Sequence, residues 1–290
     1  MKKVRKAVIP AAGYGTRFLP VTKSSAKEML PIIDTPTIDY IVREALDSGI
    51  EEILIIVSSN KNSIVDYFDR NFELESQLKE KNKLAELAII TELPKRVNIH
   101  FIRQQEQLGL GHAVLCAKSF VGNEPFALML GDDLYVGKDK PVIKQLIDAY
   151  DVTSSSIIGT LKVEDSEVDK YGIVSPLSLS SERLLEINGV TEKPNLSEAP
   201  SNLAAGGRYV LTPGIFKYLE TQTRGKGNEI QLTDSLLRLL ETEKVYSYEV
   251  NGDRYDIGSK IGFITATIDF ALKRDDLHDS VMDLLKRKVK

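Results

Sequence analysis

The chain has 290 residues, 42% hydrophobic and 28% charged, which is typical of a soluble globular protein with a sizeable core. Its net charge of -4 lacks the basic excess of a general nucleic-acid binder, and its one cysteine excludes an internal disulfide or a cysteine-rich zinc cluster. We find no secretory signal pattern and no apolar run long enough to span a bilayer. We therefore expect a cytoplasmic protein with no nucleic-acid or membrane partner.

The most informative segment lies near the start of the chain, where a short apolar strand at 7–9 leads into the sequence PAAGYGTRFLP. Small residues there leave backbone N–H groups accessible, and Arg17, Lys23 and Lys27 supply positive charge. Backbone dipoles and fixed cations both complement anionic oxygens. The segment therefore predicts a loop that binds the phosphates of a nucleoside triphosphate, although a purely structural turn is the alternative.

This loop differs from the two best-known glycine-rich nucleotide loops. Gly13 and Gly15 fit the first and third positions of the Rossmann fingerprint, but Phe18 occupies the sixth, where that fingerprint requires glycine. Pro20 prevents an immediate helix, and the Gly-Lys-Ser/Thr ending of a Walker A loop is missing. We therefore expect a phosphate-binding segment of another kind.

Strand-like and helix-like segments then alternate through the first half. Predicted strands occupy 53–57, 97–102 and 126–130, and predicted helical segments occupy 37–48, about 60–90 and 111–119. The run Ile53–Val57 is continuously apolar, as expected for a strand covered on both faces. This β-α-β order predicts an α/β, Rossmann-like fold with a mixed, mainly parallel central sheet flanked by helices.

The second half has a different pattern, with more strands joined by polar loops. Predicted strands occupy 154–163, 184–190 and 202–211, and predicted helices occupy 230–240, a segment from 261 onward, and an amphipathic tail at 277–290. No repeat or Pro/Gly/Ser-rich linker separates the halves. We therefore expect one domain, in which the second half completes a substrate pocket over the edge of the first.

Two aspartates follow the buried strand at 126–130. Asp132 and Asp133 would lie at the carboxyl end of a parallel strand, where α/β sheets bind ligands. Carboxylates at such an edge suit Mg²⁺, but a solvated Asp pair that starts a turn explains the triplet Gly-Asp-Asp equally well. Asp256 also ends a short predicted strand, and only the fold can bring it near Asp132.

Two further strings have a chemical and a structural interpretation. In Glu192-Lys193-Pro194 the carboxylate can accept hydrogen bonds from sugar hydroxyls while the ammonium meets a phosphate, and the alternative is a surface turn. Gln104 ends a predicted strand, where its amide can pair with a base edge, and Gly109 allows a flat ring to approach the backbone. The alternative is that the glycines only ease a strand-to-helix turn, which leaves Gln104 unexplained.

Several strings occur in the order found in one known family. They are GTRFLP at 15–20, KEMLP at 27–31, QLGLGHA at 107–113, Tyr171-Gly172, EKP at 192–194, GRY at 207–209, NEIQLTD at 228–234 and YDIGSK at 255–260. Through them nearly the whole chain resembles the bacterial UTP–glucose-1-phosphate uridylyltransferases, also called UDP-glucose pyrophosphorylases, of the sugar nucleotidyltransferase superfamily.

The resemblance implies uridylyl transfer from UTP to glucose 1-phosphate, giving UDP-glucose and pyrophosphate by Mg²⁺-assisted in-line attack without a covalent intermediate. It implies one nucleotidyltransferase domain, 1–290, with nucleotide binding mainly in 1–135, sugar-phosphate binding mainly in 136–260 and C-terminal helices in 261–290. It also implies a homodimer or homotetramer. The alternatives are the same fold acting on another nucleotide or sugar phosphate, such as dTTP, or a non-catalytic nucleotide sensor.

The resemblance also implies roles for individual residues. Arg17, Lys27 and Lys193 would be the catalytic cations, and Asp132 and Asp256 would hold Mg²⁺. The implied nucleotide-binding residues are Ala11, Ala12, Gly13, Gly15, Glu28, Gln104, Gly109 and Asp133. The implied sugar-binding residues are Gly172, Glu192, Lys193 and Gly207.

The chain departs from the family pattern at two places. Ala26 stands where the family usually has proline, which loosens the backbone before Lys27. Ala205 and Gly206 stand where the family usually has bulkier residues. We expect these smaller residues to widen the sugar side of the pocket.

Overall fold

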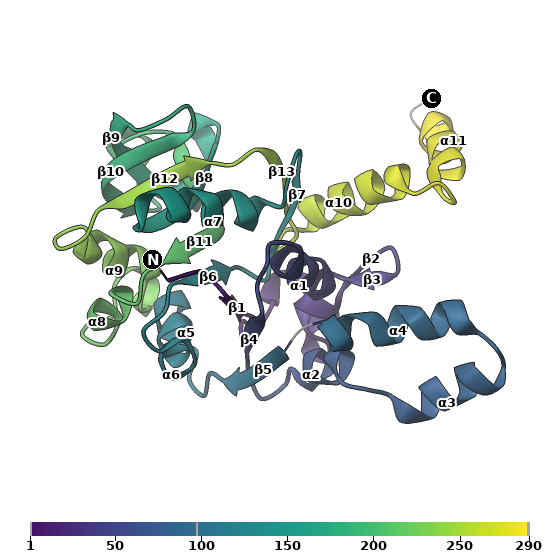
Figure 1. Ribbon diagram of the computed structural model, residues 1–290. Helices are drawn as coiled ribbons and strands as arrows, with labels where there is room; N and C mark the ends of the chain where they lie inside the picture. Colours follow the sequence, from purple (N-terminus) through teal and green to yellow (C-terminus); the bar gives the residue numbers. More distant parts are fainter. Residues whose placement is uncertain (1, 97, 289–290) are drawn as a thin grey trace.

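The computed structural model describes residues 2–96 and 98–288, and a nine-stranded sheet runs through its centre (Figure 1). Four strands form the first part of this sheet, in the order β5 (Asn98–Arg103), β4 (Glu52–Val57), β1 (Lys6–Pro10) and β6 (Phe126–Met129). All neighbouring pairs among them are parallel. This part confirms the predicted β-α-β arrangement; Val97, where the third strand was expected to begin, lies outside the described residues.

The sheet becomes largely antiparallel beyond β6. β11 (Leu203–Leu211) is antiparallel to β6 and to β8 (Ser156–Lys162), and β10 (Leu184–Glu192) is antiparallel to both its neighbours. Only β12 (Val245–Glu249) is parallel to β8 in this part of the described sheet. The remaining strand is the edge strand β9 (Gly172–Leu179). The sheet is mixed as predicted, but its second half is mainly antiparallel, and only β9 and β10 form a hairpin of consecutive strands among the pairs described there.

Each face of the sheet is covered by helices, and the alternation of side chains along β4 shows how. Ile53 and Ile55 pack with α1 (Thr37–Asp47) and α7 (Val142–Thr153) in one core, whereas Leu54 and Ile56 join the opposite core. Successive side chains of a strand point to opposite faces, so a continuous apolar run is what a doubly covered strand requires. The opposite core includes α5 (Leu110–Cys116), α8 (Ile215–Leu219) and α9 (Leu232–Leu239).

Several elements were absent from the sequence prediction. These are β9, β12, α7, α8, the small pair β2 (Pro31–Ile32) with β3 (Thr35–Pro36), and β7 (Asp133–Gly137). The short strand predicted to end at Asp256 is β13 (Gly252–Asp256), but its pairing with β7 was not predicted. The predicted helix over 111–119 is two helices, α5 and α6 (Lys118–Val121).

Two helical segments extend outward from the body in Figure 1. The polar stretch at 60–90 contains α2 (Asn62–Phe68), α3 (Phe72–Glu80) and α4 (Leu84–Arg96). At the C-terminal end, α10 (Lys260–Lys273) is followed by α11 (His278–Lys288), and residues 289–290 of the predicted tail lie outside the described part. Across the described residues, every helix is too short or too polar to cross a membrane.

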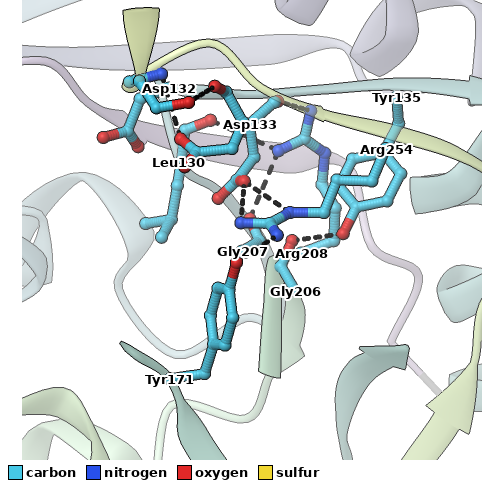
Figure 2. Close-up of polar contacts among 12 residues, drawn as sticks. Leu130, Asp132, Asp133, Tyr135, Tyr171, Gly206, Gly207, Arg208 and Arg254 are labelled. Carbon is cyan, nitrogen blue, oxygen red and sulfur yellow. Dashed lines mark hydrogen bonds and ion pairs between the residues drawn. The ribbon is translucent and has the colours of Figure 1, made fainter. Parts of the chain in front are cut away.

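A buried arginine forms hydrogen bonds with several chain segments at the centre of the sheet (Figure 2). Arg208 on β11 is fully buried, and its Nε and Nη2 donate to the Glu44 carboxylate of α1 at 2.8–3.2 Å. Its guanidinium also donates to the backbone oxygens of Leu130 at 3.3 Å and Asp133 at 2.8 Å. These bonds hold the turn between β6 and β7 against the sheet and α1.

Replacement of Glu44 by Gln should destabilise the fold strongly. The change keeps the size of the side chain but leaves the Arg208 guanidinium buried without a countercharge, which commonly costs about 3–5 kcal/mol. Urea denaturation measures the loss. The control is Glu167→Gln, which touches only the exposed pair with Lys170 and should cost less than about 1 kcal/mol. A loss below about 1 kcal/mol for Glu44→Gln would contradict the role given to this pair.

Candidate functional site

The glycine-containing loop leaves the carboxyl end of β1 and contains no α-helix. Ala11 and Ala12 are buried, whereas Gly13 is exposed, and a Cβ added to it would meet no atom within 4 Å. Gly15 has φ +65°, and its carbonyl accepts a hydrogen bond from the Thr22 hydroxyl at 2.7 Å. Short 3₁₀ helices follow at 16–18, 21–23 and 27–29, as expected if Pro20 prevents a longer helix. The loop thus presents an open backbone surface beside its cations.

Four of the predicted charged residues gather around one point. A Cβ added to Gly258 would lie 3.1 Å from Asp256 Oδ1, 3.2 Å from Asp132 Oδ2 and 3.3 Å from Arg17 Nη1. Lys27 Nζ donates to the same Asp132 oxygen at 2.8 Å, and Arg17 Nη1 donates to the Gly258 carbonyl at 3.1 Å. We call these residues, Arg17, Lys27, Asp132 and Asp256, the charged cluster. It confirms that the fold brings Asp256 to Asp132.

The pairing of β7 with β13 explains this proximity. Asp133 faces Asp256 in the register of the antiparallel pair, so the end of β13 lies beside the turn that carries Asp132. The sequence places 123 residues between the two metal candidates, whereas the hairpin-like pairing makes them neighbours. The pairing of two short strands that are distant in sequence therefore assembles the cluster.

The ion pair within the cluster changes the acidity of both partners. Burial acts to raise the pKa of Asp132, but the neighbouring Lys27 outweighs it, so that the pKa lies below its ordinary value. Burial acts to lower the pKa of Lys27, but Asp132 and Glu28 raise it above its ordinary value. Both groups are therefore charged at neutral pH, as a site for polyanions and cations requires.

Two carboxylates of the cluster fit the way proteins hold Mg²⁺. That ion usually takes one or two carboxylates and completes its shell with water and substrate phosphate oxygens. Asp132 Oδ2 and Asp256 Oδ1 both lie within 3.2 Å of one point beside Gly258. The described residues contain no group of three or more His, Cys, Asp or Glu arranged around a metal position. In such a site, water and phosphate oxygens of a bound substrate would supply the remaining ligands.

Glu28 lies beneath the loop rather than at its surface. Its carboxylate accepts a hydrogen bond from the buried Lys61 Nζ at 2.6 Å, and Oε1 has no hydrogen-bond partner. Burial raises the pKa of Glu28 above its ordinary value against the opposing effects of Lys61 and Lys27. A nucleotide that contacts Glu28, as predicted, would have to reach the buried Oε1. The pair between Glu28 and Lys61 fixes the segment that carries Lys27.

Gln104 and a second glutamine border a cavity next to the loop. Gln104 Nε2 donates to the Gly109 carbonyl at 3.2 Å and lies 2.9 Å from His112 Nδ1. Gln107 Nε2 donates to the Ala12 carbonyl at 2.8 Å, which joins this segment to the loop. The cavity has a volume of about 450 Å³ and is lined by Tyr14, Ser58, Ser59, Asn60, Arg103, Gln104, Gln105 and Gln107. Its size and its amides suit a planar polar ring.

The structure explains glycine at position 109 by the close packing of a neighbouring chain segment, whereas we expected it to admit a flat ring. Its φ is +103°, and a Cβ there would lie 2.7 Å from Glu229 Cβ and 2.9 Å from the Ile230 carbonyl. The space that a side chain would need is thus filled by the segment before α9. Glycine at this position lets the two segments of the chain pack together.

Gly172, Glu192 and Lys193 form a second group. Glu192 Oε2 accepts a hydrogen bond from the Thr233 hydroxyl at 2.9 Å, and Lys193 Nζ lies 3.3 Å from Glu192 Oε1. Lys193 has φ +47°, and its backbone N–H donates to the Tyr171 carbonyl at 2.9 Å. A Cβ on Gly172 would lie 2.8 Å from Thr233 Cγ2. The group therefore presents an oriented carboxylate beside an ammonium.

Asp133 and Gly207 lie between the two groups, in the interior. The Asp133 carboxylate is buried and paired with Arg254, whose Nε donates to Oδ1 at 2.7 Å. Burial raises the pKa of Asp133 to about 6, against the opposing effect of Arg254. A Cβ on Gly207, which has φ +76°, would lie 2.2 Å from Asp133 Oδ2. The side chain of Asp133 therefore has structural partners, and the nucleotide contact expected for this residue stays a prediction.

The expectation that Ala205 and Gly206 widen the sugar side was wrong. A Cβ on Gly206 would lie 2.3 Å from the Tyr135 hydroxyl and 2.7 Å from Leu161 Cδ2. The Tyr135 hydroxyl donates to the Gly206 carbonyl at 2.6 Å, so this tyrosine fills the space. Ala205 packs against the core that contains α9. The small residues accommodate neighbouring side chains and leave the pocket no larger.

Sequence reasoning missed four residues with contacts at the site. Gln107 bonds Ala12 of the loop, and Thr233 bonds Glu192 of the second group. Arg254 bonds both Asp133 and Tyr171. Each lies within or next to a quoted string, such as Tyr171-Gly172 or YDIGSK. The strings were a usable signal, but the contacts join positions distant in sequence.

Comparisons with known proteins identify similar sequences and structures. A family model described as nucleotidyl transferase matches residues 6–272. The chain is 51% identical, over 99% of each sequence, to "UTP–glucose-1-phosphate uridylyltransferase 2" of Staphylococcus saprophyticus.

Two solved structures are also similar. One is a UTP-bound UGPase from Acinetobacter baumannii (TM-score 0.89, 42% identity, covering 97% of this chain and 98% of that one). The other is a UDP-glucose pyrophosphorylase complexed with UDP-glucose (TM-score 0.86, 43% identity, covering 93% and 100%).

Replacement of Gly109 by Ala should cost more stability than the same change at Gly49. Both glycines have positive φ, for which alanine pays roughly 1–2 kcal/mol, but a Cβ on Gly49 would meet no atom within 4 Å. We expect a loss of about 1 kcal/mol for Gly49→Ala and at least about 2 kcal/mol for Gly109→Ala, measured by urea denaturation. Equal losses would show that Glu229 and Ile230 do not constrain this position.

Proposed function

The chain belongs to the nucleotidyl transferase family, and from this we propose that it transfers a uridylyl group from UTP to glucose 1-phosphate, with UDP-glucose and pyrophosphate as products. The observation that carries the proposal is the charged cluster at the end of the glycine-containing loop. Relatives that share about 51% sequence identity with this chain over nearly their full length support the choice of substrates.

The nucleotide would lie along the loop and into the adjacent cavity. Gly13 and Gly15 would present backbone to the phosphates, and Arg17 and Lys27 would bind phosphate oxygens at the charged cluster. The uracil would enter the cavity lined by Gln104 and Gln107, whose amides can recognise a base edge. The α-phosphate would then lie near the start of β7.

The sugar phosphate would bind to the second group. The Glu192 carboxylate, oriented by Thr233, can accept hydrogen bonds from sugar hydroxyls, and Lys193 can meet the phosphate. Gly172 and Gly207 would form part of the pocket wall through their backbone. Tyr171 and Arg254 connect this group to Asp133, next to the charged cluster.

The chemistry needs charge and position rather than a general base. The attacking group is a phosphate whose second pKa is about 6, so it is already largely ionised at neutral pH. The obstacle is repulsion between two anions, which Arg17, Lys27 and Lys193 would offset while holding the reactants in line. Mg²⁺ bound by Asp132 and Asp256 would supply further positive charge to the phosphate oxygens. We expect direct transfer without a uridylylated enzyme.

The active form is proposed to be a homodimer or homotetramer in the cytoplasm. Helix α11 has no buried residue among those described, and its Leu284 is exposed while Val281, Met282 and Leu285 are only half-buried. A short helix with an uncovered apolar side gains stability by packing on another surface. A second copy of the chain would supply that surface.

The decisive experiment measures pyrophosphate release for a panel of triphosphates and sugar 1-phosphates with and without Mg²⁺. UTP with glucose 1-phosphate should give the highest kcat/KM. Preference for dTTP or for another sugar phosphate would replace the proposed substrates, and absence of release with every pair would favour a nucleotide sensor. Isolation of a covalent uridylyl-enzyme would contradict direct transfer.

Replacement of Asp132 by Ala should remove most turnover. The change deletes one of the two proposed Mg²⁺ ligands and the partner of Lys27, and the loss of one such preorganised charge is roughly 3 kcal/mol, or about 100-fold in kcat. Steady-state kinetics and Mn²⁺ binding would both report it. The control is Asp253→Ala, an exposed aspartate on β13, which should retain nearly full activity. Activity of Asp132→Ala within a few-fold of the original would refute the metal assignment.

Replacement of Lys193 by Ala should chiefly impair use of glucose 1-phosphate. Its ammonium lies beside Glu192, so its loss would weaken a phosphate contact by about tenfold in KM while KM for UTP stays nearly constant. The matched control is Lys170→Ala, an exposed lysine paired with Glu167. Unchanged sugar-phosphate kinetics would count against the assignment of Lys193.

A further inference from the structure

Arg254 lies between the two halves of the proposed site and contacts both. Its side chain is only 13% exposed and comes from β13, two residues before Asp256. The guanidinium points toward Asp133 on one side and toward Tyr171 on the other (Figure 2). No other described arginine or lysine bonds both of these residues.

On the first side, Arg254 holds a buried carboxylate. Nε and Nη2 lie 2.7 and 2.5 Å from Asp133 Oδ1, and the Asp133 side chain is only 7% exposed. Asp133 Oδ2 in turn occupies the space beside Gly207 that a Cβ would fill. Because Asp133 follows Asp132 directly, this pair fixes the strand next to the charged cluster.

On the second side, Arg254 holds the ring of Tyr171. Nη1 donates to the Tyr171 hydroxyl at 3.1 Å, and the guanidinium carbon lies 5.0 Å from the ring centroid. A guanidinium can bond a carboxylate and a hydroxyl at once because its donors form a rigid fork, whereas a lysine has one point charge. The tyrosine side chain is therefore fixed relative to Asp133.

Tyr171 in turn fixes the position of the second group, Gly172, Glu192 and Lys193. Its carbonyl accepts the backbone N–H of Lys193 at 2.9 Å, and Lys193 is in the left-handed region, with φ +47°. The next residue, Gly172, is packed against Thr233 and Glu192. The turn that carries Lys193 is thus tied through the Tyr171 backbone and ring to Arg254.

We propose that Arg254 is a positioning residue that fixes the sugar-phosphate side of the site, through Tyr171, relative to the strand end that carries Asp132. The proposal rests on the proposed function and deepens it. Arg254 acts on glucose 1-phosphate without touching it, because the guanidinium is occupied by Asp133 and Tyr171. Its loss should therefore affect the sugar phosphate and spare UTP.

The test is a double-mutant cycle with Tyr171→Phe and Arg254→Lys. Tyr171→Phe keeps the ring and removes only the accepting hydroxyl; Arg254→Lys keeps the charge for Asp133 and loses the fork. Each should raise KM for glucose 1-phosphate by about tenfold, as expected for a hydrogen bond to a charged group, with KM for UTP within about twofold. The double variant should match Arg254→Lys, because both changes remove the same contact.

Three further measurements separate positioning from a general loss of structure. Tyr255→Phe is the matched control: it removes a hydroxyl bond to Asp269 from the neighbouring residue of β13 and should leave both KM values unchanged. Calorimetric titration with UDP-glucose in EDTA should show the same weakening for Tyr171→Phe and Arg254→Lys, independently of turnover. Melting temperatures should confirm that Tyr171→Phe folds normally.

The outcomes distinguish this proposal from the proposed function. No pyrophosphate release by the unaltered protein with UTP and glucose 1-phosphate would overturn the function and the proposal with it. Normal release together with unchanged KM values in Tyr171→Phe would overturn the proposal alone. Equal rises in both KM values, a loss confined to kcat, or effects that multiply in the double variant would also overturn it.

Discussion

The arrangement of the site depends on two buried arginines that hold the turn between β6 and β7. Arg208 bonds Glu44 and the backbone oxygens of Leu130 and Asp133, while Arg254 bonds the Asp133 side chain. A buried carboxylate or guanidinium is costly without a partner, so each of these groups restricts where the others can lie. The turn that carries Asp132 is consequently fixed from α1, β11 and β13 at once.

This constraint explains why the cluster can contain so much charge. Lys27 is paired with Asp132, and Arg17 donates to the Gly258 carbonyl beside both carboxylates, so the positive groups are held in place before any ligand binds. Preorganised charges need little rearrangement when a polyanion arrives, and they act in a partly buried place where water screens them less. The same ionic framework thus serves both stability and the proposed chemistry.

The sequence was most reliable where its patterns were periodic or where motifs follow a strand. The apolar run at 53–57 predicted a doubly covered strand, and the loop after residues 7–9 predicted the position of Arg17 and Lys27. It missed β9, β12 and β7, and it did not predict that β7 pairs with β13; β12 and the β7–β13 pair have partners that are distant in sequence. It also misjudged Gly206, because the filling side chain, Tyr135, is 71 residues away.

The sequence by itself determined the fold class, the position of the glycine-containing loop and the residue types of the charged cluster, because these follow from local pattern and the order of strands. Only the tertiary structure decided that Asp256 lies beside Asp132, that Asp133 faces Arg254 and that Tyr171 joins the two groups. The physical reason is that strand pairing and buried ion pairs join residues whose separation along the chain carries no signal of contact.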